Sequence, residues 1–378
     1  MPSESTSAAR ARAARVSGGL AALEGPLRGY HHETYVFPLP DESGVTWRWK
    51  CREPRPGLLW FDRRCFWSEE ELLVALAGHV TRIPEVIQKD GFRLQRFIEG
   101  RTLGSCARSE EDEGAAEFEA GPGTGRGADI PAGVIDQIAG LFGELAGVGP
   151  DGVAAERRCV AADRPRDGDT NGFIERLVFF TEEYVYLKNE ERFGPLFKEF
   201  GIGRDSFAVL RERVAGLTRR PFCLLHGDLH RENFVLDRCG QLWTIDWELA
   251  MVGDPLYDLA THLHLMRYAP GQEWQVVRRW CEAVSAARPG SRAGWWRDLP
   301  RLLDYKRAQS VFTDVIRAAL VLEAEQGAVG ALERAAGRVH TALGAARDAL
   351  GLGSTPSHAD VMDALKRWSW LEGERGPR

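Results

Sequence analysis

Apolar and polar positions alternate in short runs over the first hundred residues, which is the pattern of strands with one buried face. Residues 34–39 and 45–51 are rich in β-branched and aromatic side chains, and the turn sequence PDESG between them predicts a hairpin. Residues 85–100 repeat the pattern around the turn sequence KDG, which predicts two further strands. Between the two pairs, residues 67–80 space their apolar side chains as a helix does, behind Ser68 as N-cap. This order predicts a small antiparallel sheet that carries one helix.

From residue 130 onward, apolar positions recur every three or four residues, the spacing of amphipathic helices. Helices are expected over residues 130–148, 173–191, 205–218, 271–287, 299–325 and 326–350. Residues 104–129 are rich in glycine and acidic residues and nearly lack large apolar side chains, so they are expected to form a flexible surface loop.

These patterns divide the chain into a β-rich N-lobe and a larger, mostly helical C-lobe. The expected units are a frayed tail that becomes a short helix near residues 11–23 (1–24), the N-lobe (25–100), a hinge with the flexible loop (101–129), the C-lobe (130–350) and a C-terminal extension (351–378).

Composition excludes several classes of protein. The net charge of −6 gives no general attraction to a phosphate backbone, and no basic run is interleaved with aromatic side chains, so nucleic acid is not an expected partner. No apolar run approaches the roughly eighteen residues that cross a bilayer, so a soluble protein without a membrane partner is expected. The 7 cysteines lie singly without a CxxC pair, which argues against a disulfide framework or structural zinc and favours the cytoplasm. The N-terminus lacks the apolar core of a signal peptide, while a transit peptide stays open.

The chemistry is concentrated in residues 223–262, where short apolar runs alternate with polar residues. The runs FCLLHGDL, NFVLD and LWTIDW are strand-like, and DRCGQ forms a turn between the last two. Asp228, Asn233 and Asp246 should therefore lie close together at the ends or loops of a small hairpin. Two carboxylates and one amide, without a soft ligand, suit Mg²⁺ bound together with substrate phosphates. This set predicts a phosphotransferase.

The same segment resembles a known family. HGDLHREN, residues 226–233, looks like the His-x-Asp-x4-Asn catalytic loop of the protein-kinase-like superfamily, in the glycine form of aminoglycoside phosphotransferases and related choline and sugar kinases. Asp246 in IDWE falls where the superfamily carries its metal-binding Asp-Phe-Gly, and GDPLYDLA, residues 253–260, is also similar to the aminoglycoside phosphotransferase family. The resemblance covers roughly residues 20–320 and implies a bilobal protein-kinase-like fold of the α+β class.

The resemblance implies a role for each motif residue. Asp228 would be the catalytic base or orienting carboxylate for the attacking hydroxyl, and Asn233 and Asp246 would hold Mg²⁺ against the phosphates of ATP. His226 would brace the loop. A metal-binding pair of His226 and His230 is an alternative.

Two further acids in this region have open roles. Asp254 and Asp258 are interpreted as a turn residue and a helix N-cap, with contact to the substrate as the alternative.

A kinase-like N-lobe also needs a cation on its third strand to contact the nucleotide phosphates. Strand alternation places Arg48, Lys50 and Arg52 on one face, and Lys50 is the preferred candidate. Its expected partner is Glu69, with Glu70 next, although both acids also suit the positive end of the helix dipole.

The phosphate-covering loop and the hinge are less distinct. GPLRGYHHETY, residues 25–35, offers Gly25 and Gly29 in place of a Gly-x-Gly-x2-Gly series, with His31 and His32 at its tip. The hinge that would bind adenine through main-chain groups is expected at Arg96, Phe97 and Ile98.

Together, these features predict a Mg²⁺- and ATP-dependent phosphotransferase that moves the γ-phosphoryl group directly to a hydroxyl of a small molecule. Glu182 and Glu183 lie on a helix with aromatic residues and would suit a cationic or sugar-like acceptor, with a solvated helix face as the alternative. A second acceptor candidate is the helix that carries Lys306, Asp314 and Arg317.

The class of acceptor stays open at this level. An Ala-, Arg- and Gly-rich chain suggests a high-GC bacterial genome, so the first expectation is an antibiotic of aminoglycoside or nucleoside type, in resistance or self-protection. The alternatives are a housekeeping kinase for choline, a sugar or an amino alcohol, and a nucleotide-binding pseudokinase that regulates a partner.

Overall fold

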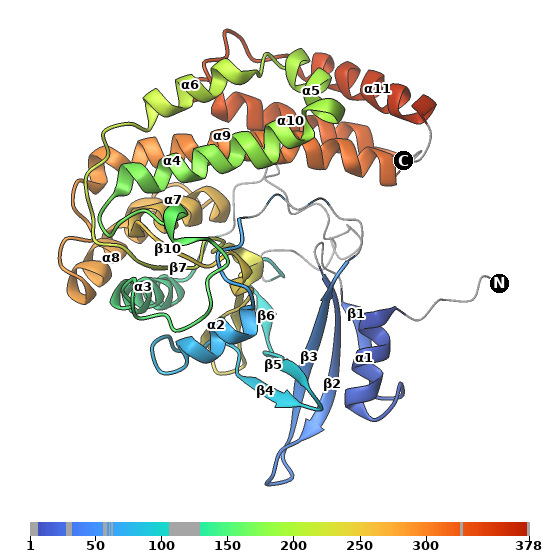
Figure 1. Cartoon of the computed structure of the whole chain (residues 1–378), viewed down its shortest axis with the longest axis vertical. Helices are drawn as coiled ribbons and strands as arrows, with labels where there is room; N and C mark the ends of the chain where they lie inside the picture. Colours follow the sequence, from blue (N-terminus) through green and yellow to red (C-terminus); the bar gives the residue numbers. More distant parts are fainter. Residues whose placement is uncertain are drawn as a thin grey trace.

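The computed structural model describes residues 7–27, 32–55, 59, 61, 63–105, 129–325 and 328–375. Most of the loop expected at 104–129 lies outside these residues, as do Gly29, His31 and the first six residues of the expected tail. The described chain forms a smaller lobe around a sheet and a larger lobe of helices (Figure 1). The expected α+β organisation is confirmed.

The N-lobe is built on a five-stranded antiparallel sheet in the order β1-β2-β3-β5-β4. Its strands are β1 (Glu24–Leu27), β2 (His32–Pro40), β3 (Thr46–Pro54), β4 (Val86–Lys89) and β5 (Phe92–Arg96). The two expected hairpins are β2–β3 and β4–β5, and β1 is an additional edge strand. Along β3, Trp49 and Cys51 are buried on one face, while Arg48, Lys50 and Arg52 alternate onto the other, as strand geometry requires.

Two helices flank this sheet rather than the one expected. Helix α1 (Ala8–Ser17) packs on the face of Trp49 and Cys51, so the expected tail contributes a structural helix. Helix α2 (Glu69–Leu76) starts at Ser68, whose hydroxyl accepts a hydrogen bond from the Glu71 amide at 3.2 Å. The buried side chains of α2 join the large hydrophobic cluster of the C-lobe and not the cluster beneath α1.

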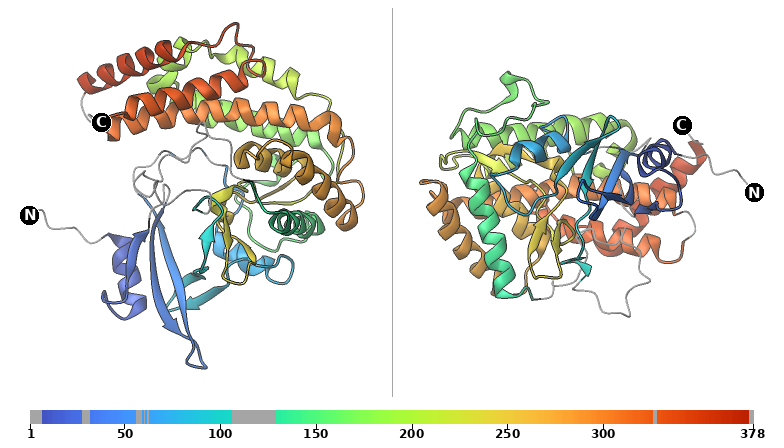
Figure 2. Two further views of the ribbon diagram at one scale, coloured as in Figure 1. Left: turned by 180° about the vertical axis from the view of Figure 1, so that it is seen from behind. Right: turned by 90° about the horizontal axis from the view of Figure 1, so that it is seen from below.

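The C-lobe consists mainly of helices (Figures 1 and 2). They are α3 (Ala132–Gly147), α4 (Thr170–Phe180), α5 (Glu190–Glu199), α6 (Arg204–Arg213), α7 (Pro255–Met266), α8 (Gln272–Ala287), α9 (Trp295–Ala324), α10 (Ala331–Ala346) and α11 (His358–Arg375). The helix expected over residues 173–191 is present but changes type, from α4 to the π-helical turn η5 (Thr181–Tyr186) and the 3-10 turn η6 (Leu187–Asn189). Helix α11 gives a defined structure to the expected C-terminal extension.

Two small sheets hold the segment that carries the motifs. Strand β7 (Cys223–Leu225) pairs with β10 (Met251–Gly253), and β8 (Phe234–Leu236) pairs with both β6 (Arg101–Thr102) and β9 (Leu242–Thr244). The catalytic-loop motif thus runs from the end of β7 to the start of β8, and Asp246 follows β9. The hairpin expected from NFVLD and LWTIDW is present.

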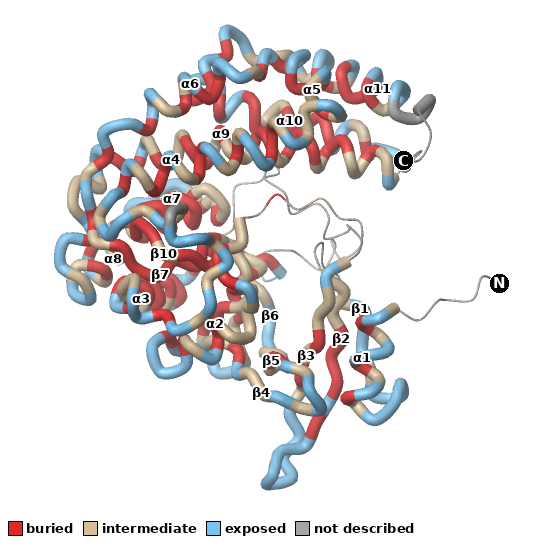
Figure 3. The backbone as a smooth tube through the Cα atoms, viewed as in Figure 1, coloured by how far each residue is buried: buried red, intermediate tan, exposed pale blue. Residues whose placement is uncertain are grey.

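Buried residues continue from α3 through β7 and β10 into α7 and α9, which places one continuous core directly behind the motif segment (Figure 3). Within the described ranges, no helix is both long and apolar enough to cross a membrane.

Candidate active site

The loop after β7 is fixed from the side of α7. Asp258, in the first turn of α7, accepts hydrogen bonds from the backbone amides of His226 and Gly227 at 3.0 and 2.8 Å. His226 is fully buried, and its Nε2 lies 3.2 Å from the carbonyl oxygen of Ile245. Gly227 has a φ of +82°, and a Cβ there would lie 2.6 Å from the carbonyl oxygen of Leu249. Only glycine fits this position, because both the backbone angle and the close approach exclude a side chain.

The loop presents Asp228 with one carboxylate oxygen occupied. The side-chain amide of Asn233 donates to the Asp228 carbonyl at 2.9 Å and to its Oδ2 at 3.2 Å. His230 Nδ1 accepts from the Glu232 amide at 3.1 Å, so the proton of the neutral ring is on Nε2, which lies 3.4 Å from Asp228 Oδ2. Among the described residues, Oδ1 of Asp228 has no hydrogen-bond donor, which leaves this oxygen for an incoming hydroxyl.

The charge of Asp228 is stabilised by its surroundings. Burial raises the pKa of Asp228, but His230, His226 and Lys306 outweigh it and hold the pKa well below the usual range. Burial lowers the pKa of His230, but the carboxylates of Asp228, Asp246 and Glu232 together raise it above its ordinary value. Asp228 is therefore ionised at neutral pH and accepts a hydrogen bond rather than carrying a proton.

Asp246 and Asn233 lie beside Asp228 and each offer a side-chain oxygen. Asp246 follows β9 in the left-handed backbone region, with a φ of +64°, which is unusual for a residue other than glycine. Burial raises its pKa, whereas Arg52 and Lys50 lower it by more. Because the Asn233 Nδ2 is used on Asp228, its Oδ1 is the group available to a ligand. One carboxylate and one amide oxygen fit Mg²⁺, because this ion retains several bound water molecules and is also coordinated by the phosphates of its substrate.

In the described segments, no three His, Cys, Asp or Glu side chains gather into a group that could hold a metal ion by themselves.

Arg52 connects the N-lobe sheet to the motif segment. Its Nη1 lies 2.8 Å from Glu69 and 3.3 Å from Asp246, and its Nη2 lies 2.9 Å from Glu248. Glu69 also accepts a hydrogen bond from the backbone amide of Trp247 at 2.8 Å. The structure thus pairs Glu69 with Arg52, whereas the sequence favoured Lys50 for this contact.

Lys50 lies on the same face of β3 as Arg52, two residues before it in the chain. Its neighbour in the sheet is Gln95, whose side-chain amide donates to both Glu69 and Glu70 at 3.0 Å. Burial lowers the pKa of Lys50, with Arg52 adding to the effect, although Glu69 and Asp246 are near enough to oppose it. Lys50 therefore borders the same group of charges without joining the ion pair.

Two of the three residues expected at the hinge already use their backbone amides in hydrogen bonds to other main-chain groups. The amide of Arg96 donates to Glu85 and that of Phe97 to Arg48, both at 2.8 Å. Within the described ranges, Ile98 is the first of the three expected residues whose amide is not used in this way. His32, expected in the phosphate-covering loop, lies beside Arg52, with its Nδ1 3.1 Å from the Arg52 Nη2.

Several expected acceptor contacts need correction. Asp258 is 1% exposed, and two backbone amides already use its oxygens, so it supports the catalytic loop and does not face an acceptor. Glu182 forms an ion pair with Arg211 of α6 at 2.6 Å, and α6 lies at the edge of the C-lobe farthest from the sheet (Figure 1). Its neighbour Glu183 is exposed on the same short turn. Asp314, in contrast, is buried in the middle of α9.

Three contributors were not among the expected site residues. Glu248 accepts hydrogen bonds from both Arg52 and Arg64 on Oε2, at 2.9 and 2.8 Å. Its position two residues after Asp246 was a signal for it, whereas nothing in the sequence singles out Arg64. His230 was considered only as a metal ligand, and its spacing from Asp228 gave no indication of their contact.

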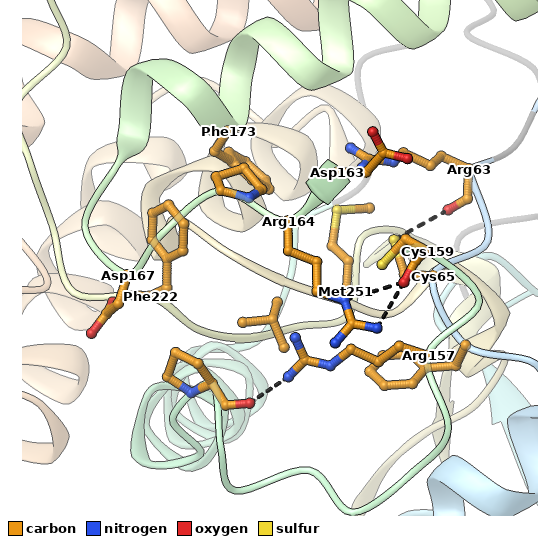
Figure 4. Close-up of a pocket in the computed structure, with 14 residues that line it drawn as sticks. Arg63, Cys65, Arg157, Cys159, Asp163, Arg164, Asp167, Phe173, Phe222 and Met251 are labelled. Atoms are coloured by element: carbon orange, nitrogen blue, oxygen red, sulfur yellow. Dashed lines mark hydrogen bonds between the residues drawn. The ribbon is translucent and has the colours of Figure 1, made fainter. Parts of the chain in front are cut away.

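A pocket lies elsewhere in the C-lobe, next to β10 (Figure 4). Its lining includes Arg63 and Cys65 from the segment before α2 and Arg157, Cys159 and Arg164 from the segment before α4. The guanidinium groups of Arg157 and Arg164 donate to main-chain carbonyls of Pro150 and Cys159. None of the expected site residues lines this pocket.

Comparison with known proteins identifies the family. The model of the phosphotransferase enzyme family matches residues 24–295, from the first residue of β1 to the first residue of α9. No curated protein gives a significant match.

Solved structures with a similar arrangement are remote in sequence. The apoenzyme of a macrolide 2′-phosphotransferase from Brachybacterium faecium is 16% identical and covers 88% of this chain and 93% of its own, with a TM-score of 0.45. An ethanolamine kinase from Plasmodium vivax is 13% identical and covers 85% and 82%, with a TM-score of 0.49. A thermostable mutant of an aminoglycoside phosphotransferase, in a ternary complex with ADP and hygromycin B, is 15% identical and covers 91% and 99%, with a TM-score of 0.47.

Proposed function

The chain belongs to the phosphotransferase enzyme family, whose members act on hydroxyl groups of small molecules, and from this premise we propose that it transfers the γ-phosphoryl group of ATP to such a hydroxyl. The observation that carries the proposal is the position of Asp228. Its Oδ2 is held by Asn233 and His230, and its charge is retained at neutral pH, so Oδ1 is oriented to accept a hydrogen bond from the acceptor hydroxyl.

The residues around Asp228 would bind the nucleotide phosphates and their metal ion. Asp246 and the Oδ1 of Asn233 would hold Mg²⁺, which neutralises charge on the transferring phosphoryl group when it is bound with the nucleotide. Arg52 is the cation that we assign to the phosphates, because Glu69 and Glu248 fix both of its terminal nitrogens beside Asp246. Lys50 is near enough to add positive charge, and the main chain at Ile98 would meet the adenine.

For the acceptor, we propose a hydroxylated antibiotic of aminoglycoside or nucleoside type, with a role in resistance or self-protection in the cytoplasm. The Ala-, Arg- and Gly-rich composition supports this choice, and a housekeeping kinase for choline, a sugar or an amino alcohol is the alternative. A pseudokinase is disfavoured because Asp228, Asn233 and Asp246 are all present and in hydrogen-bonding or electrostatic contact.

The test is ADP release with Mg-ATP and a panel of hydroxylated antibiotics and primary metabolites, using Asp228→Asn as the variant. Asparagine keeps the shape of the side chain but removes the charge that orients the hydroxyl, so kcat should fall by about 10²–10⁴. Nucleotide affinity, measured by calorimetry, should change only a few-fold.

Asp237→Asn is the matched control, because Asp237 lies in the β8–β9 turn, where its side chain accepts from the amides of Cys239 and Gln241 and from the indole of Trp243 on β9. Equal turnover in Asp228→Asn and the native protein would remove Asp228 from the reaction.

A further inference from the structure

The pocket beside β10 is lined by three arginines that form no ion pair with any described residue (Figure 4). Arg63 comes from the segment before α2, and Arg157 and Arg164 come from the segment before α4. The Arg63 guanidinium group also has no hydrogen-bond acceptor in the described part of the chain. Arg157 and Arg164 donate to neutral groups, the main-chain carbonyls of Pro150 and Cys159. The pocket therefore holds three positive charges without a carboxylate against them.

The two acidic residues on the pocket wall do not supply the missing charge, because each is engaged elsewhere. Asp163 forms an ion pair with Arg176 of α4 at 3.5 Å. Asp167 lies 3.7 Å from Arg288 and accepts a hydrogen bond from the backbone amide of Phe222 at 2.6 Å. Like charges around one small cavity repel one another, and a bound anion removes this repulsion.

The three positive charges converge on one side chain of the pocket, the thiol of Cys65. Burial raises the pKa of this thiol to about 11, and Arg63, Arg157 and Arg164 each act to lower it. A cation has this effect because it favours the thiolate over the thiol, and it must lie nearby to do so. Three separate guanidinium groups are thus close to the same interior point.

The free donors and the size of the cavity suit a small oxyanion. Arg157 donates to its carbonyl through Nη2, and Arg164 donates through Nε and Nη2, so the Nη1 group of each remains for a ligand, together with the whole guanidinium group of Arg63. The cavity has a volume of about 60 Å³, which corresponds to about four to six positions the size of a water molecule. Four oxygens around one central atom fill a space of this size.

The lining favours phosphate over a carboxylate. Phe173, Phe222 and Met251 form apolar walls, and a hydrogen bond between charged groups is stronger where such walls exclude water. The planar guanidinium group matches the spacing of phosphate oxygens with two parallel N–H bonds. A carboxylate offers two oxygens and one charge, which is too little for three arginines.

From these observations we propose that this pocket is a second phosphate-binding site, in which Arg63, Arg157 and Arg164 hold either the phosphoryl group of a small metabolite or the free phosphate ion. The site is distinct from the nucleotide site, because none of the residues assigned to Mg²⁺, ATP or the reacting hydroxyl lines it. The bound group does not react, and the inference is independent of the proposed reaction. Its effect is to join the segment before α4 to the segment before α2, where Arg64 donates to Glu248 at 2.8 Å.

The experiment is titration calorimetry of the full chain with two probes, inorganic phosphate and glycerol 3-phosphate, at constant ionic strength. Mg²⁺ and a non-hydrolysable ATP analogue are present at saturating concentration, so that the probes do not enter the nucleotide site. The native protein should bind at least one probe at a single site. Tighter binding of glycerol 3-phosphate would identify the occupant as a phosphorylated metabolite, and tighter binding of inorganic phosphate would identify it as the free ion.

Arg63→Gln is the first variant, because the side chain that it removes has no hydrogen bond or ion pair in the described structure, and the fold should persist. The affinity for the probe should fall by about 10- to 100-fold, the loss expected for one charge-assisted hydrogen bond. Arg164→Gln should show a loss of similar size. Thermal unfolding verifies that both variants are folded, and added probe should raise the native midpoint more than that of either variant.

Arg158→Gln is the matched control. Arg158 is adjacent to Arg157 in the chain, but its guanidinium carbon lies 5.1 Å from the ring centroid of Trp67, and it does not line the pocket. This variant should keep the native affinity.

Three results would overturn the proposal. The first is that the native protein binds neither probe. The second is native affinity in both Arg63→Gln and Arg164→Gln, which would place the probe elsewhere. The third is an equal loss in Arg158→Gln, because the effect would then come from the net charge of the protein and not from the pocket.

Discussion

The carboxyl group of Asp314 opposes folding at neutral pH. Burial raises its pKa from the ordinary value of 3.8 to about 6, even though Arg317, Arg338 and Arg267 favour the charged form. The folded protein therefore holds this proton more tightly than the unfolded chain does. The stability associated with the protonated group is complete below about pH 4 and is lost as the pH rises through 6, and a difference of two pKa units corresponds to about 3 kcal/mol.

Asp314→Asn should consequently be more stable than the native protein at pH 8, by up to about 3 kcal/mol, and equal to it near pH 4. Urea unfolding of both proteins at the two pH values measures this. A gain of the same size at both values would mean that the effect does not come from ionisation.

At the residue scale, the sequence was most informative where the contacts are local. Asp228 and Asn233 are five residues apart in one loop, so their association follows from the motif itself. The choice between Lys50 and Arg52 could not be made in this way, because strand alternation gives both the same face. Which of them meets Glu69 depends on how α2 is seated against the sheet, and this is a tertiary contact with no signature in either segment.

At the scale of elements, one buried arginine joins the starts of two helices to the strand that leads into the catalytic loop. Arg220 is 1% exposed and lies three residues before β7. Its guanidinium group contacts Asp254, the N-cap of α7, and Asp298, in the first turn of α9, each at 2.8 Å. The start of α9 and the helix that supports the loop after β7 therefore share this buried arginine.

Arg220→Met should lower the free energy of unfolding by about 3–5 kcal/mol, because the buried carboxylate of Asp254 loses its cation and Asp298 keeps Arg297 alone. Chemical denaturation measures the loss. The control is Arg213→Met, whose ion pair with Asp304 involves an arginine side chain that is 47% exposed, and this should cost less than about 1 kcal/mol. Equal losses in the two variants would show that burial does not decide the effect.

Helices could be predicted from the sequence where one face of the helix is polar and the other is buried. The start of helix α7 was expected at an N-cap Asp258, four residues after the observed N-cap Asp254, because ten of its twelve residues are buried and it lacks the amphipathic pattern of α8 or α10. The change to a π-helical turn at η5 also has no sequence signal, since TEEYVY continues the helical spacing of α4. The spacing of hydrophobic residues identifies a helix that is buried on one side only. It cannot identify a helix at the centre of the molecule that is buried on all sides.

At the scale of the whole molecule, the hydrophobic side chains form two clusters. The smaller one holds α1 against β2, β3 and β5, and the larger one includes the C-lobe helices together with Leu72, Leu73 and Leu76 of α2. The expected N-lobe is thus divided by its packing, because the fully buried side chains of α2 belong to the C-lobe core, whereas the sheet contributes to that core the partly buried Val86 of β4.

In moderate urea, the sheet should unfold before the C-lobe, since its separate cluster buries far less apolar surface. Hydrogen exchange should then show amides of β2 and β3 exchanging first and those of α2 exchanging together with α3 and α7. If α2 exchanged with the strands, the helix would belong to the sheet as the sequence order suggested.

Arg52 makes contacts between the sheet and the segments that belong to the larger cluster. Arg52 belongs to the sheet, whereas Glu69, Asp246 and Glu248 belong to segments anchored in the larger cluster. A nucleotide that binds Arg52 and Asp246 at once would cross-link two units whose fully buried clusters are separate. The cooperativity of the molecule would then depend on its ligand, with separate thermal transitions in the free protein merging into one when the nucleotide is bound.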